Sequence, residues 1–281
     1  MLKKLALAAT ALAPLVMGFA APGAAQAAEL PSHIRSRGAI IAAVVPNYPP
    51  LEMRDPQTNA LTGFDIELGE ALAAKLGVKM QWQETSFDQM LASVRTGRVD
   101  IILSGMSDLK TRQDTATFVD YLRSGSQFFT QASRAAEFPN PEALCGKKVG
   151  ASRRTALPND IKGFSDANCV AKGRPAIEYV PTEGSADART QLRQGRIDAA
   201  MQGGETLPYI QGLEPNTYAL VGEPVRFTLM GIATGKDETG LQQALAEALK
   251  GLIADGTYAK LAAKWQLTPS MIPEVQINGG N

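Results

Sequence analysis

The chain has 281 residues, and its 28 lysines and arginines balance its 28 aspartates and glutamates, so the formal net charge is zero. It contains no basic run that would follow a phosphate backbone, which argues against nucleic acid as a partner. The length suffices for two lobes, each able to bury its own core.

The N-terminus has the layout of a cleavable signal peptide. Lys3 and Lys4 precede an apolar run over 5–21, and the small-residue site Ala25-Gln26-Ala27 follows. A membrane anchor is the alternative, but Pro14 interrupts a run that is short for a span. We expect a signal peptide over 1–27, whose removal leaves 254 residues with 26 basic and 28 acidic side chains, and export to the periplasm.

Short apolar runs rich in β-branched residues predict buried strands. They cover 40–45, 78–83, 99–103, 148–151, 177–180 and 197–201. Helical patterns lie between them, as over 65–76, where Gly77 follows as a helix-ending glycine, and after Ser86, a candidate N-cap. This alternation predicts an α/β fold with mainly parallel sheets and helices on both faces, and with ligands at the carboxyl ends of the strands.

Two small-residue breaks predict crossings between the lobes. Ser124-Gly125-Ser126 precedes an apolar run over 127–131, and Gly222-Glu223-Pro224 precedes another over 225–232. We therefore expect the following parts: a first lobe over 28–125, a second lobe over 126–223, a return to the first lobe over 224–268, and a surface tail over 269–281.

Cys145 and Cys169 are the two cysteines of the chain. An even count in an exported protein predicts a disulfide, which would close a loop of 24 positions. The alternative is a metal or redox pair, but the two residues lack CxxC spacing and a histidine partner.

Seven motifs occur in an order that resembles the polar amino-acid family (family 3) of periplasmic solute-binding proteins of ABC transporters. They are Pro46-Asn47-Tyr48-Pro49-Pro50, Gly63-Phe64-Asp65-Ile66-Glu67-Leu68, Gly97-Arg98-Val99-Asp100, Ser104-Gly105-Met106-Ser107 with Arg112, Gly146-Lys147-Lys148-Val149-Gly150, Gly195-Arg196-Ile197-Asp198-Ala199 and Asp255-Gly256-Thr257-Tyr258. The resemblance covers nearly the whole mature chain. It implies the type II fold of two lobes joined by two hinge strands, with an amino acid or related small carboxylate bound in the cleft, an inner-membrane ABC permease as partner, a monomer, and no cofactor.

Candidate ligand contacts follow the strand at 99–103. Ser104, Gly105 and Ser107 lie where backbone N–H groups and hydroxyls converge on an anion. Arg112 has the planar fork that pairs with a carboxylate, and the resemblance assigns the matching arginine to the ligand's α-carboxylate.

Aromatic residues complete the expected first-lobe side of the cleft. The resemblance places Tyr48 and Phe87 beside the ligand side chain, although both residue types also suit a core. Val45 stands where members that bind basic amino acids often have an aspartate, which disfavours a basic ligand.

The second lobe departs from the family pattern. Gly203 occupies the position of the aspartate that clamps an α-ammonium, so either Glu205 replaces it or the ligand has no ammonium. A Gly-Thr-Thr segment reads Arg154-Thr155-Ala156 here, next to Arg153. The two arginines either bind a second anionic group or are solvated, and Glu205 is either a ligand contact or a solvated residue in the first turn of a helix. Fewer anions and more cations than in the family pattern favour an acidic or non-amino carboxylate as ligand. We place Arg154, Thr155, Gly203 and Glu205 among the ligand-binding candidates.

Two other classes remain open. Cyclohexadienyl dehydratases resemble the same family, and Glu205, if buried, would be the general acid of such an enzyme. A ligand sensor uses the same fold. Neither a metal site nor a catalytic residue is assigned, because phosphate-loop and HExxH motifs are absent from the sequence.

Overall fold

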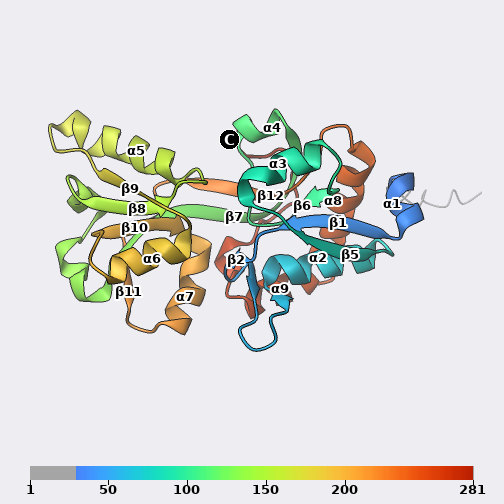
Figure 1. The fold of residues 1–281 in the computed structure, drawn as a ribbon, viewed down its shortest axis with the longest axis horizontal. Coiled ribbons are helices and arrows are strands. Elements are labelled where there is room, and N and C mark those ends of the chain that lie inside the picture. Colours follow the sequence, from blue (N-terminus) through green and yellow to red (C-terminus); the bar gives the residue numbers. More distant parts are fainter. Residues whose placement is uncertain (1–29, 281) are drawn as a thin grey trace, which may run out of the picture.

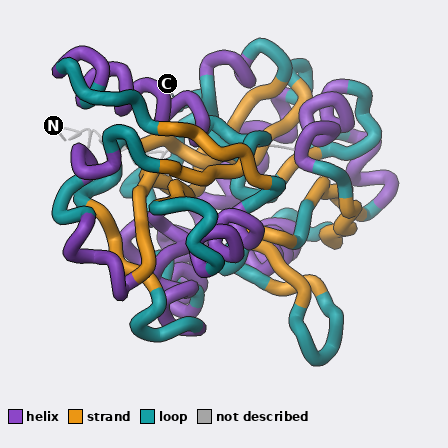
Figure 2. Tube along the Cα trace, turned by 60° about the vertical axis from the view of Figure 1, so that its left-hand side comes forward, coloured by secondary structure: helices purple, strands orange, loops and turns teal. Residues whose placement is uncertain are grey.

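The computed structural model describes residues 30–280, which form two α/β lobes joined by two long strands (Figure 1). The crossing strands are β7 (Ala116–Gln131) and β12 (Phe227–Gly235). Helices lie around the long central strands, and a hairpin loop projects from the body of the molecule (Figure 2). This arrangement confirms the predicted fold class.

The first lobe combines the N-terminal half of the described chain with its last helices. Its strands are β1 (Ala39–Val44), β2 (Asn47–Tyr48), β3 (Glu52–Arg54), β4 (Leu61–Thr62), β5 (Lys79–Glu84) and β6 (Ile101–Ile102). Its helices are α1 (Ser32–Arg37), α2 (Phe64–Lys75), α3 (Phe87–Arg95), α4 (Lys110–Gln113), α8 (Thr239–Ala254) and α9 (Thr257–Lys264), followed by the 3₁₀ turn η5 (Thr268–Ser270).

The second lobe is formed by the middle of the chain. It contains β8 (Lys148–Ser152), β9 (Glu178–Thr182), β10 (Ala199–Gly203) and β11 (Tyr218–Val221) with α5 (Leu157–Asn168), α6 (Ser185–Arg193) and α7 (Leu207–Leu213). Four 3₁₀ turns connect them: η1 (Ala132–Glu137), η2 (Pro141–Leu144), η3 (Val170–Lys172) and η4 (Gly204–Thr206).

One sheet path runs through both lobes in the order β5-β1-β6-β12-β7-β10-β8-β9, and β11 also pairs with β7. The pairs β1–β5, β1–β6, β8–β9 and β8–β10 are parallel, whereas β7 and β12 are antiparallel to their neighbours. Because parallel strands end on the same side, the carboxyl ends of β6, β8 and β10 all face the region between the lobes.

The six predicted strands are confirmed within two residues at each end, as is the helix predicted over 65–76. Ser86 does precede α3, but its side chain makes no capping hydrogen bond. The break predicted at Ser124-Gly125-Ser126 is wrong, because β7 continues through it. Gly125 is small for a different reason: a Cβ there would lie 2.8 Å from Pro224 Cβ, so glycine lets the second crossing segment pack closely.

Separate apolar clusters fill the two lobes. The first-lobe cluster joins α2, α8 and α9, and includes Leu68, Leu249 and Tyr258, all fully buried. The second-lobe cluster includes Phe128 of β7 and Val149 of β8. The lobe boundaries expected at 125 and 223 stay a prediction, since β7 passes the first without interruption.

The predicted disulfide between Cys145 and Cys169 is confirmed. The signal peptide expected over 1–27 lies outside the described residues. Across residues 30–280, every helix is too short or too polar to cross a bilayer.

The segment expected as a surface tail over 269–281 makes specific contacts with the first lobe. Ile277 bridges to Val119 of β7, and the N–H groups of Gly279 and Gly280 donate to the carboxylates of Asp120 and Asp108. Gly280 is buried, although Ile277 is exposed.

Candidate functional site

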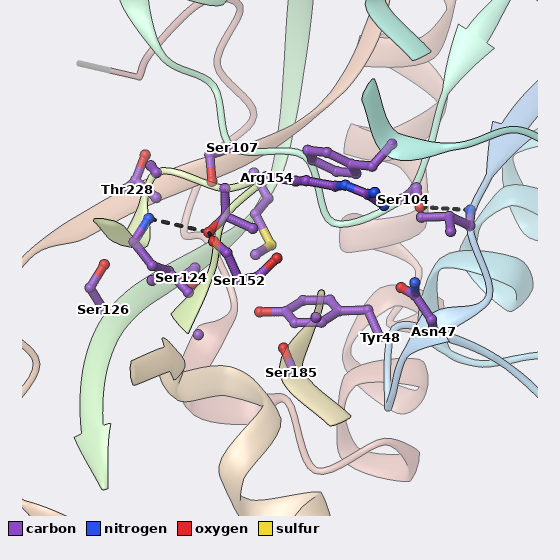
Figure 3. A pocket seen from close by; sticks show the side chains of 18 of the residues that line it. Asn47, Tyr48, Ser104, Ser107, Ser124, Ser126, Ser152, Arg154, Ser185 and Thr228 are labelled. Atoms are coloured by element: carbon purple, nitrogen blue, oxygen red, sulfur yellow. Dashed lines mark hydrogen bonds between the residues drawn. The ribbon is translucent and has the colours of Figure 1, made fainter. Parts of the chain in front are cut away.

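A cavity of about 190 Å³ lies between the lobes, at the carboxyl ends of the parallel strands (Figure 3). This volume suits a ligand smaller than a typical drug molecule. Its lining comes from the first lobe (Val45, Asn47, Tyr48, Glu52, Ser86, Phe87, Ser104, Ser107), from the crossing segments (Ser124, Ser126, Arg226, Thr228, Met230) and from the second lobe (Ser152, Arg154, Thr155, Ala156, Leu157, Asp160, Glu183, Gly184, Ser185, Gly203). Ten of these 23 residues carry a hydroxyl group.

The first-lobe wall rests on a buried pair of carboxyl groups. Ser104 Oγ donates to Glu52 Oε1 at 2.8 Å, and Tyr121 and the Gly105 N–H both donate to Asp65 Oδ2. Neither Glu52 Oε2 nor Asp65 Oδ1 has a hydrogen-bond partner among the described residues. Burial raises the pKa of Glu52 well above its usual range and that of Asp65 to about 6.

A hydrogen-bonded bridge crosses the floor of the cavity between the lobes. Tyr48 Oη donates to Glu205 Oε1 at 2.7 Å, and Ser124 Oγ donates to Glu205 Oε2 at 2.5 Å. Glu205 is 4 % exposed, and burial raises its pKa. Tyr48 reaches into the cavity from the first lobe (Figure 3), so one ring both lines the pocket and holds the second lobe in place.

Gly203 leaves the space that this bridge occupies. A Cβ at position 203 would lie 2.0 Å from Glu205 Oε1 and 2.3 Å from Tyr48 Oη. Any side chain there would displace the carboxylate, so Gly203 and Glu205 are sterically matched.

Arg112 lies directly behind the lining. Its guanidinium packs over the Phe87 ring, 5.5 Å from the centroid, and Nη1 donates to the Ser107 carbonyl at 2.9 Å. Burial lowers its pKa, but an arginine this basic stays charged. Within residues 30–280 no acidic side chain forms an ion pair with it, so its charge remains available at the first-lobe side of the cleft.

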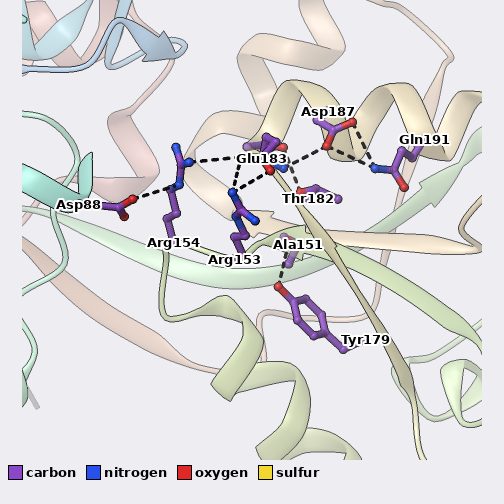
Figure 4. A network of polar contacts seen from close by, with 10 residues as sticks. Asp88, Ala151, Arg153, Arg154, Tyr179, Thr182, Glu183, Asp187 and Gln191 are labelled. Atoms are coloured by element: carbon purple, nitrogen blue, oxygen red, sulfur yellow. Dashed lines mark hydrogen bonds and ion pairs between the residues drawn. The ribbon is translucent and has the colours of Figure 1, made fainter. Parts of the chain in front are cut away.

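Arg154 joins the lobes at the edge of the cavity. Its Nε lies 3.2 Å from Asp88 of α3, and its Nη2 lies 3.3 Å from Glu183 of the second lobe (Figure 4). Arg153 also pairs with Glu183. The two arginines are therefore occupied by acidic side chains of the protein itself.

The predicted site residues fall into two groups. Tyr48, Phe87, Ser104, Ser107, Arg154, Thr155 and Gly203 line the cavity, whereas Gly105, Arg112 and Glu205 lie immediately behind it. The N–H of Gly105 points at Asp65 rather than at the cavity. Their roles in binding stay predictions.

Several lining residues were missed. Asp160 accepts from Ser126 Oγ at 2.5 Å and pairs with Arg226 at 3.1 Å, which places an ion pair on the second-lobe wall. The small-residue motif at 124–126 is the signal that points to Ser124 and Ser126. Nothing in the sequence marks Glu52, because its partner Ser104 is 52 positions away.

None of the described residues forms a group of three or more histidine, cysteine or acidic side chains suited to a metal ion.

Two α/β lobes that share two strands and have a small cavity between them define a two-lobe ligand-binding protein. The family model for bacterial extracellular solute-binding proteins, family 3, matches residues 40–268. The chain therefore belongs to family 3 of the bacterial extracellular solute-binding proteins.

Three similar proteins are named as binding proteins. The chain is 31 % identical over 258 residues to the histidine-binding periplasmic protein of Escherichia coli K12, covering 89 % of this chain and 94 % of that one. It also resembles the solved structure of an ancestral arginine-binding protein bound to arginine (TM-score 0.72, 26 % identity, 82 % of this chain and 98 % of that one). The ancestral amino acid-binding protein AncCDT-1, a precursor of cyclohexadienyl dehydratase, is similar at TM-score 0.72 and 27 % identity, covering 83 % of this chain and 97 % of that one.

Proposed function

We propose that this protein binds an amino acid or a closely related small carboxylate between its lobes in the periplasm, and that the closed monomer delivers it to an inner-membrane ABC permease. The observation that carries the proposal is the cavity, to which both lobes and both crossing strands contribute polar side chains. A ligand that contacts both lobes stabilises the closed state over the open one, and this population shift is the signal that a permease reads.

The relatives support the same ligand class. Their names specify histidine and arginine, and the ancestral structures contain or are named for amino acids. Position 45 is valine in this chain, and it lines the cavity, so we place a less basic amino acid ahead of lysine or arginine.

Catalysis is the second candidate, because Glu205 is a buried carboxyl with a raised pKa. In the structure, however, Glu205 accepts hydrogen bonds from Tyr48 and Ser124 and is arranged as an acceptor rather than as a proton donor. This geometry favours binding over acid catalysis.

The test is a thermal melt of the mature protein, refolded to remove carried-over ligand, against amino acids, dicarboxylates, aromatic carboxylates and prephenate. A ligand at 100 times its dissociation constant should stabilise the protein by about 2.7 kcal/mol. Arg112→Ala should abolish this stabilisation while the unliganded variant still unfolds cooperatively, since truncating a buried charge partner costs about 2–5 kcal/mol of binding free energy. Turnover of prephenate would favour the enzyme, and wild-type affinity in Arg112→Ala would remove the arginine from the site.

A further inference from the structure

Glu205 is a buried carboxylate without a cationic partner in the described part of the chain. Burial and hydrogen bonds from Ser124, Tyr48 and its own backbone N–H set its pKa, and no cation is among these groups. An ionised carboxylate in such a place is costly unless a positive charge lies near it. The cavity is the side from which a ligand can approach this carboxylate, because both of its hydroxyl partners line the cavity.

The orientation of the hydroxyl groups shows what kind of ligand group this wall accepts. Tyr48 and Ser124 each have one hydroxyl proton, and each donates it to Glu205. Ser104 similarly donates its proton to Glu52 while it accepts from the Val45 N–H at 3.1 Å. All three oxygens therefore present only lone pairs to a ligand, so they accept hydrogen bonds from an N–H donor and repel a carboxylate.

Gly203 makes this arrangement possible. The carboxylate of Glu205 occupies the place that a side chain at 203 would take, at 2.0 Å from the position of its Cβ. Glu205 thus supplies a negative charge beside the cavity although residue 203 is a glycine.

We propose that Glu205 is a specificity-determining residue that selects ligands with a protonated amine, which hydrogen-bonds to the Tyr48 and Ser124 hydroxyls and neutralises the buried carboxylate. This proposal rests on the proposed function, because it identifies one chemical group on the ligand of the same cleft. It excludes the alternative that the ligand is a carboxylic acid without an ammonium group.

The experiment uses matched probes that differ only in this group. Calorimetric titration of the refolded mature protein compares alanine with lactate, aspartate with malate, phenylalanine with phenyllactate, and histidine with imidazolelactate. We expect one amine to bind at least about 30-fold more tightly than its hydroxy acid, the size of effect that removing one partner of a buried charge pair produces.

Three variants assign that discrimination to Glu205. Glu205→Gln keeps the shape, and it should weaken the amine about 30-fold while leaving the hydroxy acid within threefold. Tyr48→Phe, which retains the ring, should reduce the discrimination in the same direction. The matched control is Glu183→Gln, a cavity-lining acid that already pairs with Arg153 and Arg154, and it should leave the discrimination unchanged.

A swap provides the positive test. Gly203→Asp combined with Glu205→Ala and Tyr48→Phe removes both side-chain groups that a Cβ at 203 would meet and moves the carboxylate to position 203, so it should recover the preference for the amine relative to Glu205→Ala with Tyr48→Phe. Equal binding of an amine and its hydroxy acid, or an unchanged preference in Glu205→Gln, overturns the inference while the proposed function stands. If no probe binds the wild-type protein, the proposed function and the inference fail together.

Discussion

Asp120 shows how a single buried carboxyl makes stability depend on pH. Its side chain is fully buried at the start of β7, accepts the Gly279 N–H at 3.0 Å, and faces Asp108. Burial and then the charge of Asp108 raise the pKa of Asp120 to about 8. An aspartate in the unfolded chain has a pKa of about 4, so the folded state binds this proton more tightly than the unfolded state does. The free energy of unfolding therefore falls as pH rises from about 4 to about 8. The stabilisation from this proton is fully present below a pH of about 4, the pKa of the aspartate in the unfolded chain.

Asp120→Asn should reduce this pH dependence, because an amide reproduces the hydrogen bonding of the protonated acid without titrating. Urea unfolding near pH 5 and near pH 8.5 measures it. The raised pKa values of Glu52 and Asp65 also make the free energy of unfolding fall as pH rises. The test therefore compares the change in unfolding free energy between the two pH values in the variant with that in the wild type. The exposed Asp114→Asn serves as the control, and equal slopes in wild type and Asp120→Asn would contradict the assignment.

At the scale of elements, the disulfide joins the segment before β8 to the end of α5. It links Cys145, which follows η2, to Cys169, which is fully buried in the second-lobe cluster. The cross-link restricts the unfolded chain over 24 positions. Its effect on the folded state should be confined to the second lobe.

Replacing both cysteines with serine should lower the free energy of unfolding by about 3 kcal/mol in the chain-entropy model. Hydrogen exchange should show faster opening in β8, β9 and α5 than in α2 and α8. Reducing agent should destabilise the wild type and leave the double variant unchanged. A uniform loss of protection in both lobes would show that the cross-link supports the whole protein.

The elements were predictable to the extent that burial leaves a local pattern. The run 40–45 is apolar and rich in β-branched residues, and it became β1 of the central sheet. The break expected at 124–126 failed because small residues there serve close packing against Pro224, a contact 99 positions away in sequence for Gly125. Site residues were predictable from the sequence only where they belong to a recognisable motif. The bridge of Tyr48 to Glu205 joins residues 157 positions apart, and no local pattern reports such a pair.

At the scale of the whole molecule, the Asp88–Arg154 pair spans the gap between the lobes. Asp88 belongs to α3, and Arg154 follows β8, so the pair exists only when the lobes are close. Both side chains are substantially exposed, at 59 % and 37 %. Exposed pairs contribute only about 0–1 kcal/mol, so this contact adjusts the lifetime of the closed state rather than creating it.

Arg154→Ala should therefore raise the ligand dissociation rate by no more than about fivefold. The wild-type rate should increase between about 0.05 M and 0.5 M salt, and the variant should be less sensitive. Stopped-flow dissociation measures both, and Asp88→Asn should match Arg154→Ala. A loss of affinity beyond about 30-fold in Arg154→Ala alone would show instead that this arginine binds an anionic group of the ligand.

The order of segments along the chain also determines how the protein can fold. The second lobe is nearly continuous in sequence, but the first lobe needs β12, α8 and α9, whose residues arrive after position 226. Its apolar cluster contains Leu68 together with Leu249 and Tyr258, so forming this cluster closes loops of well over a hundred residues. Such distant contacts slow folding. Until its last helices are made, the first lobe of a newly synthesised chain has an incomplete sheet with an exposed apolar face, whereas the residues of the second lobe are already present.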